Sequence, residues 1–237
     1  MSAASLDRVR IEDPFGVTAD AALEDIAVAL DPEAMEGRLA AALRERVAGT
    51  ARLREIRVVR HKPGRRCLIE YGFDVVSANG ASRPLTLIGK ARASHRPETV
   101  YQRQLALTAA GFGEDSADGI SVPDALACFP ELNLWLQHKV EGRPATQLLD
   151  EPDAGALVAR IAEAARKVHG CHVTTKRAHS MADEIRILRE RLPAVAAGEP
   201  RWASRIGSLL AACDRLAATV PPPAATGIHR DFYPDQV

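Results

Sequence analysis

The 237-residue sequence has no excess of either charge and few of the side chains that mark specialised surfaces. Its 31 Lys and Arg balance 31 Asp and Glu, which argues against a nucleic acid or an anionic membrane held by bulk charge. Aromatic residues make up only 4%, too few to predict a base-stacking platform. The N-terminus is charged, and no apolar run reaches the length of a membrane helix. We therefore expect a cytoplasmic protein whose partners include neither nucleic acid nor membrane.

Two further scarcities concern cysteine and lysine. The 4 cysteines form no Cys-x-x-Cys pair, so the spacing predicts free thiols rather than a zinc or redox motif. Only 5 of the 31 cationic residues are lysine. A lysine at an unusual place in this sequence therefore calls for a physical reason.

The period of the apolar pattern changes along the chain and predicts an α+β protein with two lobes. Residues 1–50 form a helical segment, in which Asp31 before Pro32 is typical of a helix start. A β-rich lobe follows over 51–140, with a helix predicted over 97–110 and strands over 54–60, 67–75, 85–93, 121–129 and 132–140. A partial helical lobe covers 141–237, where Ser180 and Asp183 form a capping box and 202–220 is amphipathic.

The end of the sequence holds the pattern with the most chemical content. His229-Arg230-Asp231 is followed by an aromatic pair, and Gln236 stands five residues after the acid. In phosphoryl transfer an acid orients the attacking hydroxyl and accepts its proton, while an amide oxygen holds a metal on the phosphates. The pattern therefore predicts Asp231 as the catalytic base and Gln236 as a metal ligand. A surface tail with a local hydrogen bond is the alternative.

This segment resembles the catalytic loop of the aminoglycoside phosphotransferase and choline kinase-like family, which shares the protein-kinase-like fold. The resemblance covers about residues 54–237 and makes the β-rich lobe the nucleotide-binding one. It implies transfer of the γ-phosphoryl group of ATP, with Mg²⁺, to a hydroxyl of a small molecule, and it assigns His229 to the support of the loop. A catalytically dead nucleotide-binding or regulatory module is the alternative reading of the same segment.

The resemblance also assigns residues that would bind the nucleotide. Lys90 stands near the end of the predicted third strand, where the family places a lysine on the phosphates; a strand-end lysine that reaches solvent is the alternative. The turn with Gly64 and Arg65 joins the first two strands, where kinase-like folds cover the phosphates. A solvated basic hairpin tip explains that turn equally well.

Three more assignments depend on the resemblance alone. Glu98 is the candidate partner of the strand lysine, although its place in the first helical turn also suits the helix dipole. Backbone groups from Gln137 to Lys139 would bind adenine, whereas Trp135 is expected in the core. The family continues with a second acidic metal ligand and substrate-binding helices, so we expect a chain truncated after its catalytic loop and inactive as it stands.

Overall fold

The structure is a computed structural model that describes residues 8–44, 46–93, 96–152, 154–175, 178–222 and 224–232. The chain divides into two compact units, Met1–Ala165 with Asp231–Val237, and Arg166–Arg230. One division falls inside helix α4 (Ala154–Gly170) and the other inside the predicted catalytic loop. The segment boundaries predicted at residues 50 and 140 do not coincide with these divisions and stay predictions.

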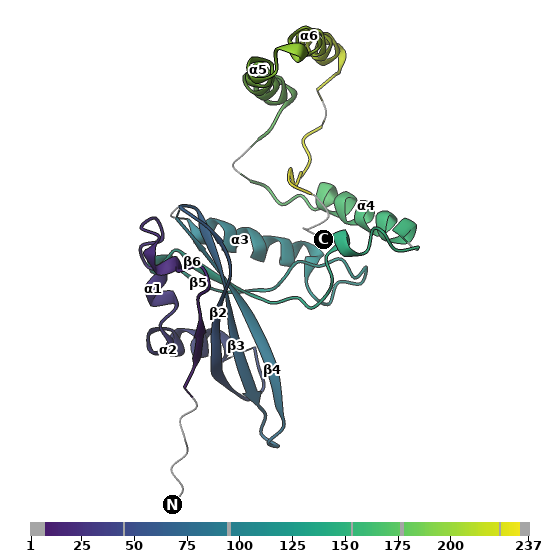
Figure 1. The fold of residues 1–237 in the computed structure, drawn as a ribbon. Coiled ribbons are helices and arrows are strands. Elements are labelled where there is room, and N and C mark those ends of the chain that lie inside the picture. The colour runs from purple at the N-terminus through teal and green to yellow at the C-terminus, as the bar shows by residue number, and fades with distance from the viewer. Residues whose placement is uncertain are drawn as a thin grey trace, which may run out of the picture. The chain divides into compact units, whose positions relative to one another are not determined.

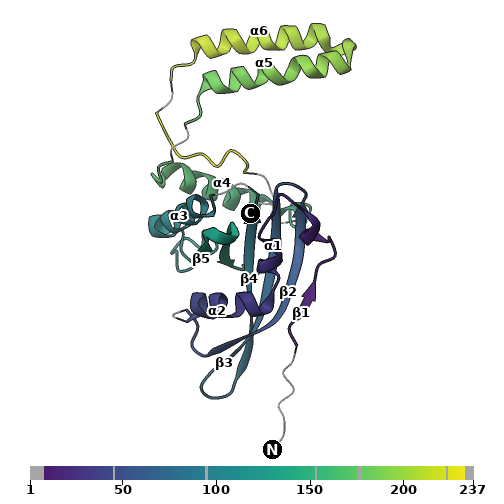
Figure 2. The same ribbon diagram turned by 90° about the vertical axis from the view of Figure 1, so that its left-hand side faces the viewer.

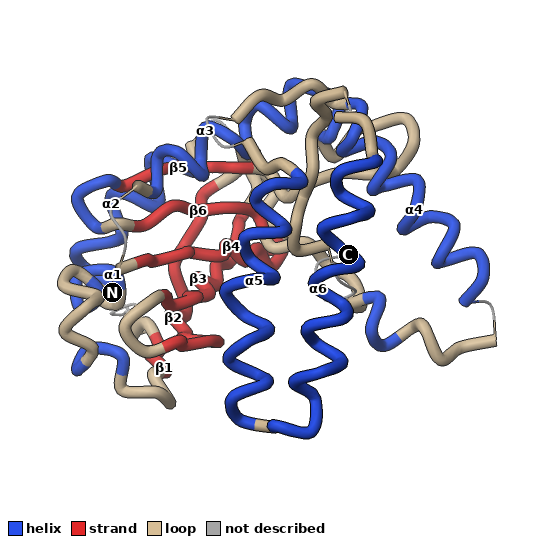
Figure 3. The backbone as a smooth tube through the Cα atoms, turned by 90° about the horizontal axis from the view of Figure 1, so that it is seen from above, coloured by secondary structure: helices blue, strands red, loops and turns tan. Residues whose placement is uncertain are grey.

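A six-stranded mixed sheet dominates the first unit, with the strand order β1-β2-β3-β4-β6-β5 (Figure 3). Only β1 pairs in parallel, with β2, and the other neighbours are antiparallel. The strands are β1 Arg10–Glu12, β2 Thr50–Lys62, β3 Arg66–Val76, β4 Ser82–Arg92, β5 Ala125–Phe129 and β6 Leu134–His138. The α+β class and the five predicted strands are confirmed. The short strand β1 was not predicted, because three residues carry no measurable periodicity.

Alternation along β3 gives the sheet two different faces. The odd-numbered residues Cys67, Ile69, Tyr71, Phe73 and Val75 are buried. The even-numbered residues between them, which include Glu70, are only partly buried. Successive side chains of a strand point to opposite faces, so the odd residues face the core and the even ones form a second, polar face.

Helices α1 (Ile26–Ala29) and α2 (Pro32–Leu43) cover the core face of the sheet (Figures 1 and 2). The Asp31 side chain accepts a hydrogen bond of 3.0 Å from the Glu33 amide, which confirms the predicted cap. The buried side chains of α2 recur every four residues, at Met35, Leu39 and Leu43. Within the predicted helical segment 1–50, residues 21–25 before α1 form turns and a bend instead of helix.

Helix α3 (Pro97–Leu107) packs against β5 and β6. The Gln104 amide anchors it by donating a 2.6 Å hydrogen bond to the Pro123 carbonyl. A π-type turn over Thr108–Phe112 follows, and Gly111 ends it with φ +91°. The 3₁₀ turns are Val17–Ala19, Pro130–Leu132, Ala145–Gln147 and Pro200–Trp202.

The second unit contains the helical hairpin of α5 (Met181–Gly198) and α6 (Ala203–Thr219). The predicted capping box of Ser180 and Asp183 opens α5. Arg189 of α5 and Asp214 of α6 form an ion pair of 2.9 Å across the hairpin. Among the described residues, none of the helices combines the length and the hydropathy required to cross a bilayer.

Candidate active site

Lys90 lies on the polar face of the sheet, because its neighbours Gly89 and Ala91 are buried on the core face. Its cross-strand partners are Leu68 of β3 and Trp135 of β6. The Lys90 Nζ stands 4.8 Å from the centre of the Trp135 ring, which is a favourable place for a cation. The lysine is therefore held in partly buried, aromatic surroundings.

Packing holds the Trp135 ring in this position. Its side chain is 2% exposed, and its indole Nε1 finds no hydrogen-bond partner among the described residues. A buried N–H without an acceptor is uncommon in proteins. The expectation that Trp135 belongs to the core agrees with this burial, and its face serves as the floor beneath the Lys90 ammonium.

The charges that shift the pKa of Lys90 are cationic. Burial lowers its pKa to about 8, and the charges of Arg92 and Arg66 act in the same direction. Within the described part of the chain, no carboxylate forms an ion pair with it. A partly buried ammonium without a counter-charge is costly, so this position favours a bound anion.

Lys90 belongs to a larger group at one end of the sheet, which we call the cationic cluster: Lys62, Arg65, Arg66, Lys90 and Arg92. Arg66 is at its centre, because the register places it opposite both Lys62 and Arg92. Its charge is the largest cause of the lowered pKa of Lys62. The pKa of Arg92 is lowered first by burial and then by Arg66 and Arg103 of α3.

The tip of the β2–β3 hairpin is held by an acidic side chain from the N-terminal segment. The Gly64 amide donates a 2.8 Å hydrogen bond to Asp20 Oδ2, and His61 Nε2 lies 2.8 Å from the same oxygen. These contacts, that with His61 foremost, lower the pKa of Asp20. The Gly64 amide that the resemblance assigns to a phosphate is thus bonded to a carboxylate, while Arg65 beside it is exposed.

Asp231 is exposed and belongs to the same unit as the cationic cluster. Its charge raises the pKa of Lys62, against the repulsion of the neighbouring arginines. This attraction brings the predicted base and the hairpin into one electrostatic field. His229, two residues earlier, is exposed as well, and Gln236 lies outside the described residues.

The chain that leads into the predicted catalytic loop is docked on the end of α4. The Thr226 hydroxyl donates a 2.5 Å hydrogen bond to the His169 carbonyl. A Cβ atom on Gly227 would meet the Val168 carbonyl oxygen at 2.8 Å. Glycine is therefore required for this close approach of two backbones.

Glu98 and Lys90 are not joined by an ion pair in the described residues. Glu98 is exposed in the first turn of α3. Its charge contributes, after burial, to raising the pKa of Cys128 in β5 to about 11. The structure therefore places this carboxylate beside β5, and its predicted role toward the nucleotide stays a prediction.

The residues predicted to bind adenine are engaged in the sheet. Gln137 is buried in β6. The Lys139 ammonium lies 2.8 Å from one carboxylate oxygen of Glu70, and Arg57 lies 2.5 Å from the other. Burial raises the pKa of Glu70, but the two cations outweigh it and hold the pKa below its usual value.

The backbone amides at this strand end already have acceptors. The His138 amide donates to the Asp124 carbonyl at 2.9 Å, and the Lys139 amide donates to the Thr86 carbonyl at 3.1 Å. A base bound beside these residues would have to use groups other than these two amides. The assignment of Gln137 and Lys139 to adenine therefore stays a prediction.

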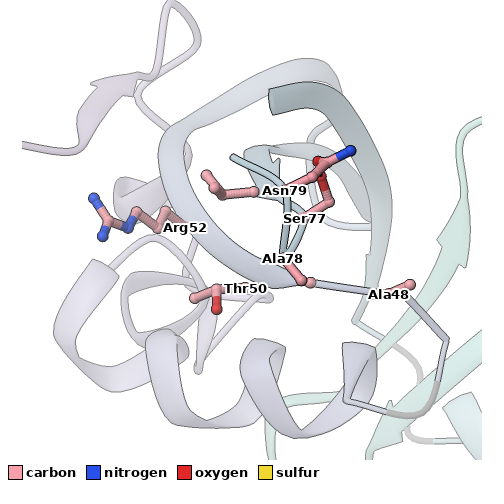
Figure 4. Close-up of a pocket in the computed structure, with 8 residues that line it drawn as sticks. Ala48, Thr50, Arg52, Ser77, Ala78 and Asn79 are labelled. Atoms are coloured by element: carbon pink, nitrogen blue, oxygen red, sulfur yellow. The ribbon is translucent and has the colours of Figure 1, made fainter. Parts of the chain in front are cut away.

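A separate pocket of about 710 Å³ opens at the opposite end of the β2–β3 pair, where Thr50 faces Val76 (Figure 4). Its walls are Ala48, Gly49, Thr50, Arg52, Val76, Ser77, Ala78 and Asn79. Arg52 is the single ionisable side chain among them, and the Ser77 hydroxyl is bonded to Asn79 and the Ala81 carbonyl. This lining contains no carboxylate, imidazole or thiol that could act as an acid, a base or an activated nucleophile.

Comparison with protein families decides the classification. Residues 90–237 match the model of the family described as the phosphotransferase enzyme family. The chain belongs to that family. The match begins at Lys90 and includes Asp231, and it confirms the resemblance derived from the sequence. No curated protein and no solved structure matches the chain significantly.

The surroundings of Lys90 and the hairpin tip contain residues that the sequence did not single out. Arg92 stands two positions after Lys90, so strand alternation could have placed both cations on one face. The same rule could have placed Glu70 on the polar face of β3. No sequence signal indicated Asp20, which is 44 residues from Gly64.

Proposed function

We propose that this phosphotransferase moves the γ-phosphoryl group of ATP to a hydroxyl of a small molecule. The observation that carries the proposal is that Asp231 belongs to the same unit as Lys90 and acts electrostatically on Lys62, in the hairpin at the sheet end that holds Lys90. Phosphoryl transfer needs cations on the phosphates and a carboxylate beside the acceptor hydroxyl. Membership of the phosphotransferase family supports the same class of reaction.

The proposed roles follow from the chemistry of the two groups. Lys90 binds a phosphate oxygen and offsets charge that spreads over the transferred group in the transition state. Asp231 orients the acceptor hydroxyl and takes its proton as the new oxygen–phosphorus bond forms. The bond from the γ-phosphorus to the β–γ bridging oxygen breaks, and ADP leaves with that electron pair.

Mg²⁺ is part of the proposal, with Gln236 as the candidate ligand. The described residues contain no group of three or more metal-ligating His, Cys, Asp or Glu side chains, and Gln236 lies outside them. The proposed metal would offset phosphate charge. We derive no step of the reaction through it.

Production of ADP from ATP across a panel of aminoglycosides, amino alcohols and sugars, measured for this chain and for a form extended by the natural downstream sequence, tests the proposal. Asp231→Asn should lower the transfer rate about a hundredfold to ten-thousandfold, the usual contribution of a general base. Asp150→Asn is the matched control, because Asp150 is an exposed loop aspartate before α4. Its rate should equal that of the unchanged protein.

Two results would contradict the proposal. ATP binding without any Asp231-dependent transfer would favour a nucleotide-binding or regulatory module. Transfer that survives Asp231→Asn unchanged would show that another group is the base. ATP binding is measured separately, so that a loss of phosphoryl transfer can be distinguished from a loss of ATP binding.

A further inference from the structure

Two lysines on the polar face of the sheet have opposite surroundings. Lys139 has the counter-charge that a structural lysine normally has, since it pairs with Glu70 at 2.8 Å. Lys90 instead has Arg92 and Arg66 as the charges that lower its pKa, after burial. Folding alone gives no reason to gather two further cations around one partly buried ammonium.

The sheet register creates this group of charges. Arg66 of β3 and Arg92 of β4 are direct cross-strand partners, and Lys90 stands two residues before Arg92 on the same face. Like charges directly opposite one another destabilise a sheet. Arg92 is also partly buried and meets the charge of Arg103 from α3. The described residues provide none of these three cations with a carboxylate partner.

We propose that Arg66 and Arg92 form, together with Lys90, a polyphosphate clamp that binds two adjacent phosphate groups of a nucleoside di- or triphosphate. The identity of the nucleotide rests on the proposed function, whereas the clamp itself requires only a polyphosphate. A guanidinium presents a planar fork that matches two phosphate oxygens, and lysine supplies a point charge. Three cations are neutralised by a di- or triphosphate and not by a phosphate monoester.

The clamp explains why Lys90 needs no carboxylate from α3. Because no carboxylate in the described residues pairs with Lys90, Arg66 or Arg92, their charges are available to a polyphosphate. Binding should therefore discriminate by the number of phosphates: inorganic tripolyphosphate and ATP bind well, and AMP binds weakly. It should also weaken steeply as salt is raised, because each contact is a charge contact.

Titration calorimetry on the full chain with sodium tripolyphosphate, ATP and AMP tests the clamp. Arg66→Gln and Arg92→Gln should each weaken tripolyphosphate and ATP binding about tenfold to a hundredfold, the usual effect of losing a charge-assisted hydrogen bond. Arg66→Lys, which keeps the charge and loses the fork, should fall between. Arg83→Gln is the matched control, since Arg83 is an exposed residue near the far end of β4 and should leave binding unchanged.

Urea denaturation of the unliganded variants separates binding from a structural role. Removing one of several mutually repelling cations should keep or raise the free energy of unfolding, whereas loss of a structural residue lowers it. Absence of tripolyphosphate binding to the unchanged protein would overturn the clamp. Unaltered affinity in both glutamine variants, or a loss of binding that tracks a loss of stability, would overturn it too.

The clamp and the proposed function can fail separately. Loss of tripolyphosphate binding in Arg66→Gln, with no Asp231-dependent transfer in any form, would leave the clamp and reject the phosphotransfer proposal. Asp231-dependent transfer with unchanged ATP affinity in both glutamine variants would reject the clamp and leave the phosphotransfer proposal.

Discussion

Replacing Lys90 by methionine should stabilise the folded chain while it weakens ATP binding. Methionine keeps the length and the apolar stem of lysine but carries no charge. The change removes an ammonium that is buried over Trp135 beside Arg66 and Arg92. In the unliganded protein that charge has an unfavourable environment, so its loss favours folding.

The magnitude follows from the pKa of Lys90, which falls from 10.5 in its ordinary environment to about 8 in the folded chain. At 1.36 kcal/mol for each pH unit, the charged form costs about 3 kcal/mol below pH 8. The contact with the Trp135 ring returns about 1 to 2 kcal/mol. We therefore expect Lys90→Met to raise the free energy of unfolding by about 1 to 2 kcal/mol at pH 7.

The lowered pKa of Lys90 also determines how the stability difference between Lys90→Met and the unchanged protein depends on pH. Between about pH 8 and 10.5 the unfolded chain binds more protons than the folded chain at Lys90, so the cost of the charge declines as pH rises. The stability advantage of Lys90→Met should therefore shrink across this window. Urea denaturation followed by circular dichroism at pH 7, 9 and 10.5 measures it.

Lys139→Met is the matched control with the opposite sign. It removes a lysine that pairs with Glu70, so we expect a loss of about 1 kcal/mol in the free energy of unfolding. The reasoning is refuted if Lys90→Met is less stable than the unchanged protein at pH 7. It is refuted equally if the difference is constant from pH 7 to 10.5.

Two further predictions concern the core and the hairpin tip. Gly89→Ala would place a methyl group 2.7 Å from a ring carbon of Tyr71. Urea denaturation should therefore show a loss of about 1 to 3 kcal/mol in the free energy of unfolding. An unchanged free energy of unfolding would mean that the Tyr71 ring moves aside without cost. Asp20→Ala removes the acceptor of the Gly64 amide, whose hydrogen exchange should accelerate. In the unchanged protein that protection should be present above the ordinary aspartate pKa of 3.8 and be lost as pH falls through the lowered pKa of Asp20; exchange at an equal rate in the variant would reject the contact.

Local chemistry in the sequence was enough to predict most of the secondary structure, although not strand β1. The cap of α2 at Asp31 was predictable because a helix cap involves only about three consecutive residues. The alternation of apolar residues along β3 likewise indicates a sheet with one buried face. The predicted loop from His229 to Gln236 was readable for the same reason: its polar groups are contiguous in the chain. A prediction from contiguous residues does not require knowledge of the tertiary packing.

Tertiary structure decided which charges meet. Lys90 was a candidate phosphate contact in the sequence, but the register between β3 and β4 brings Arg66 and Arg92 to it, while α3 leaves Glu98 near β5. Gly64 likewise meets Asp20 from 44 residues away. Electrostatic interactions depend on distance in space, and that distance is set by strand register and helix packing, which no short stretch of sequence encodes.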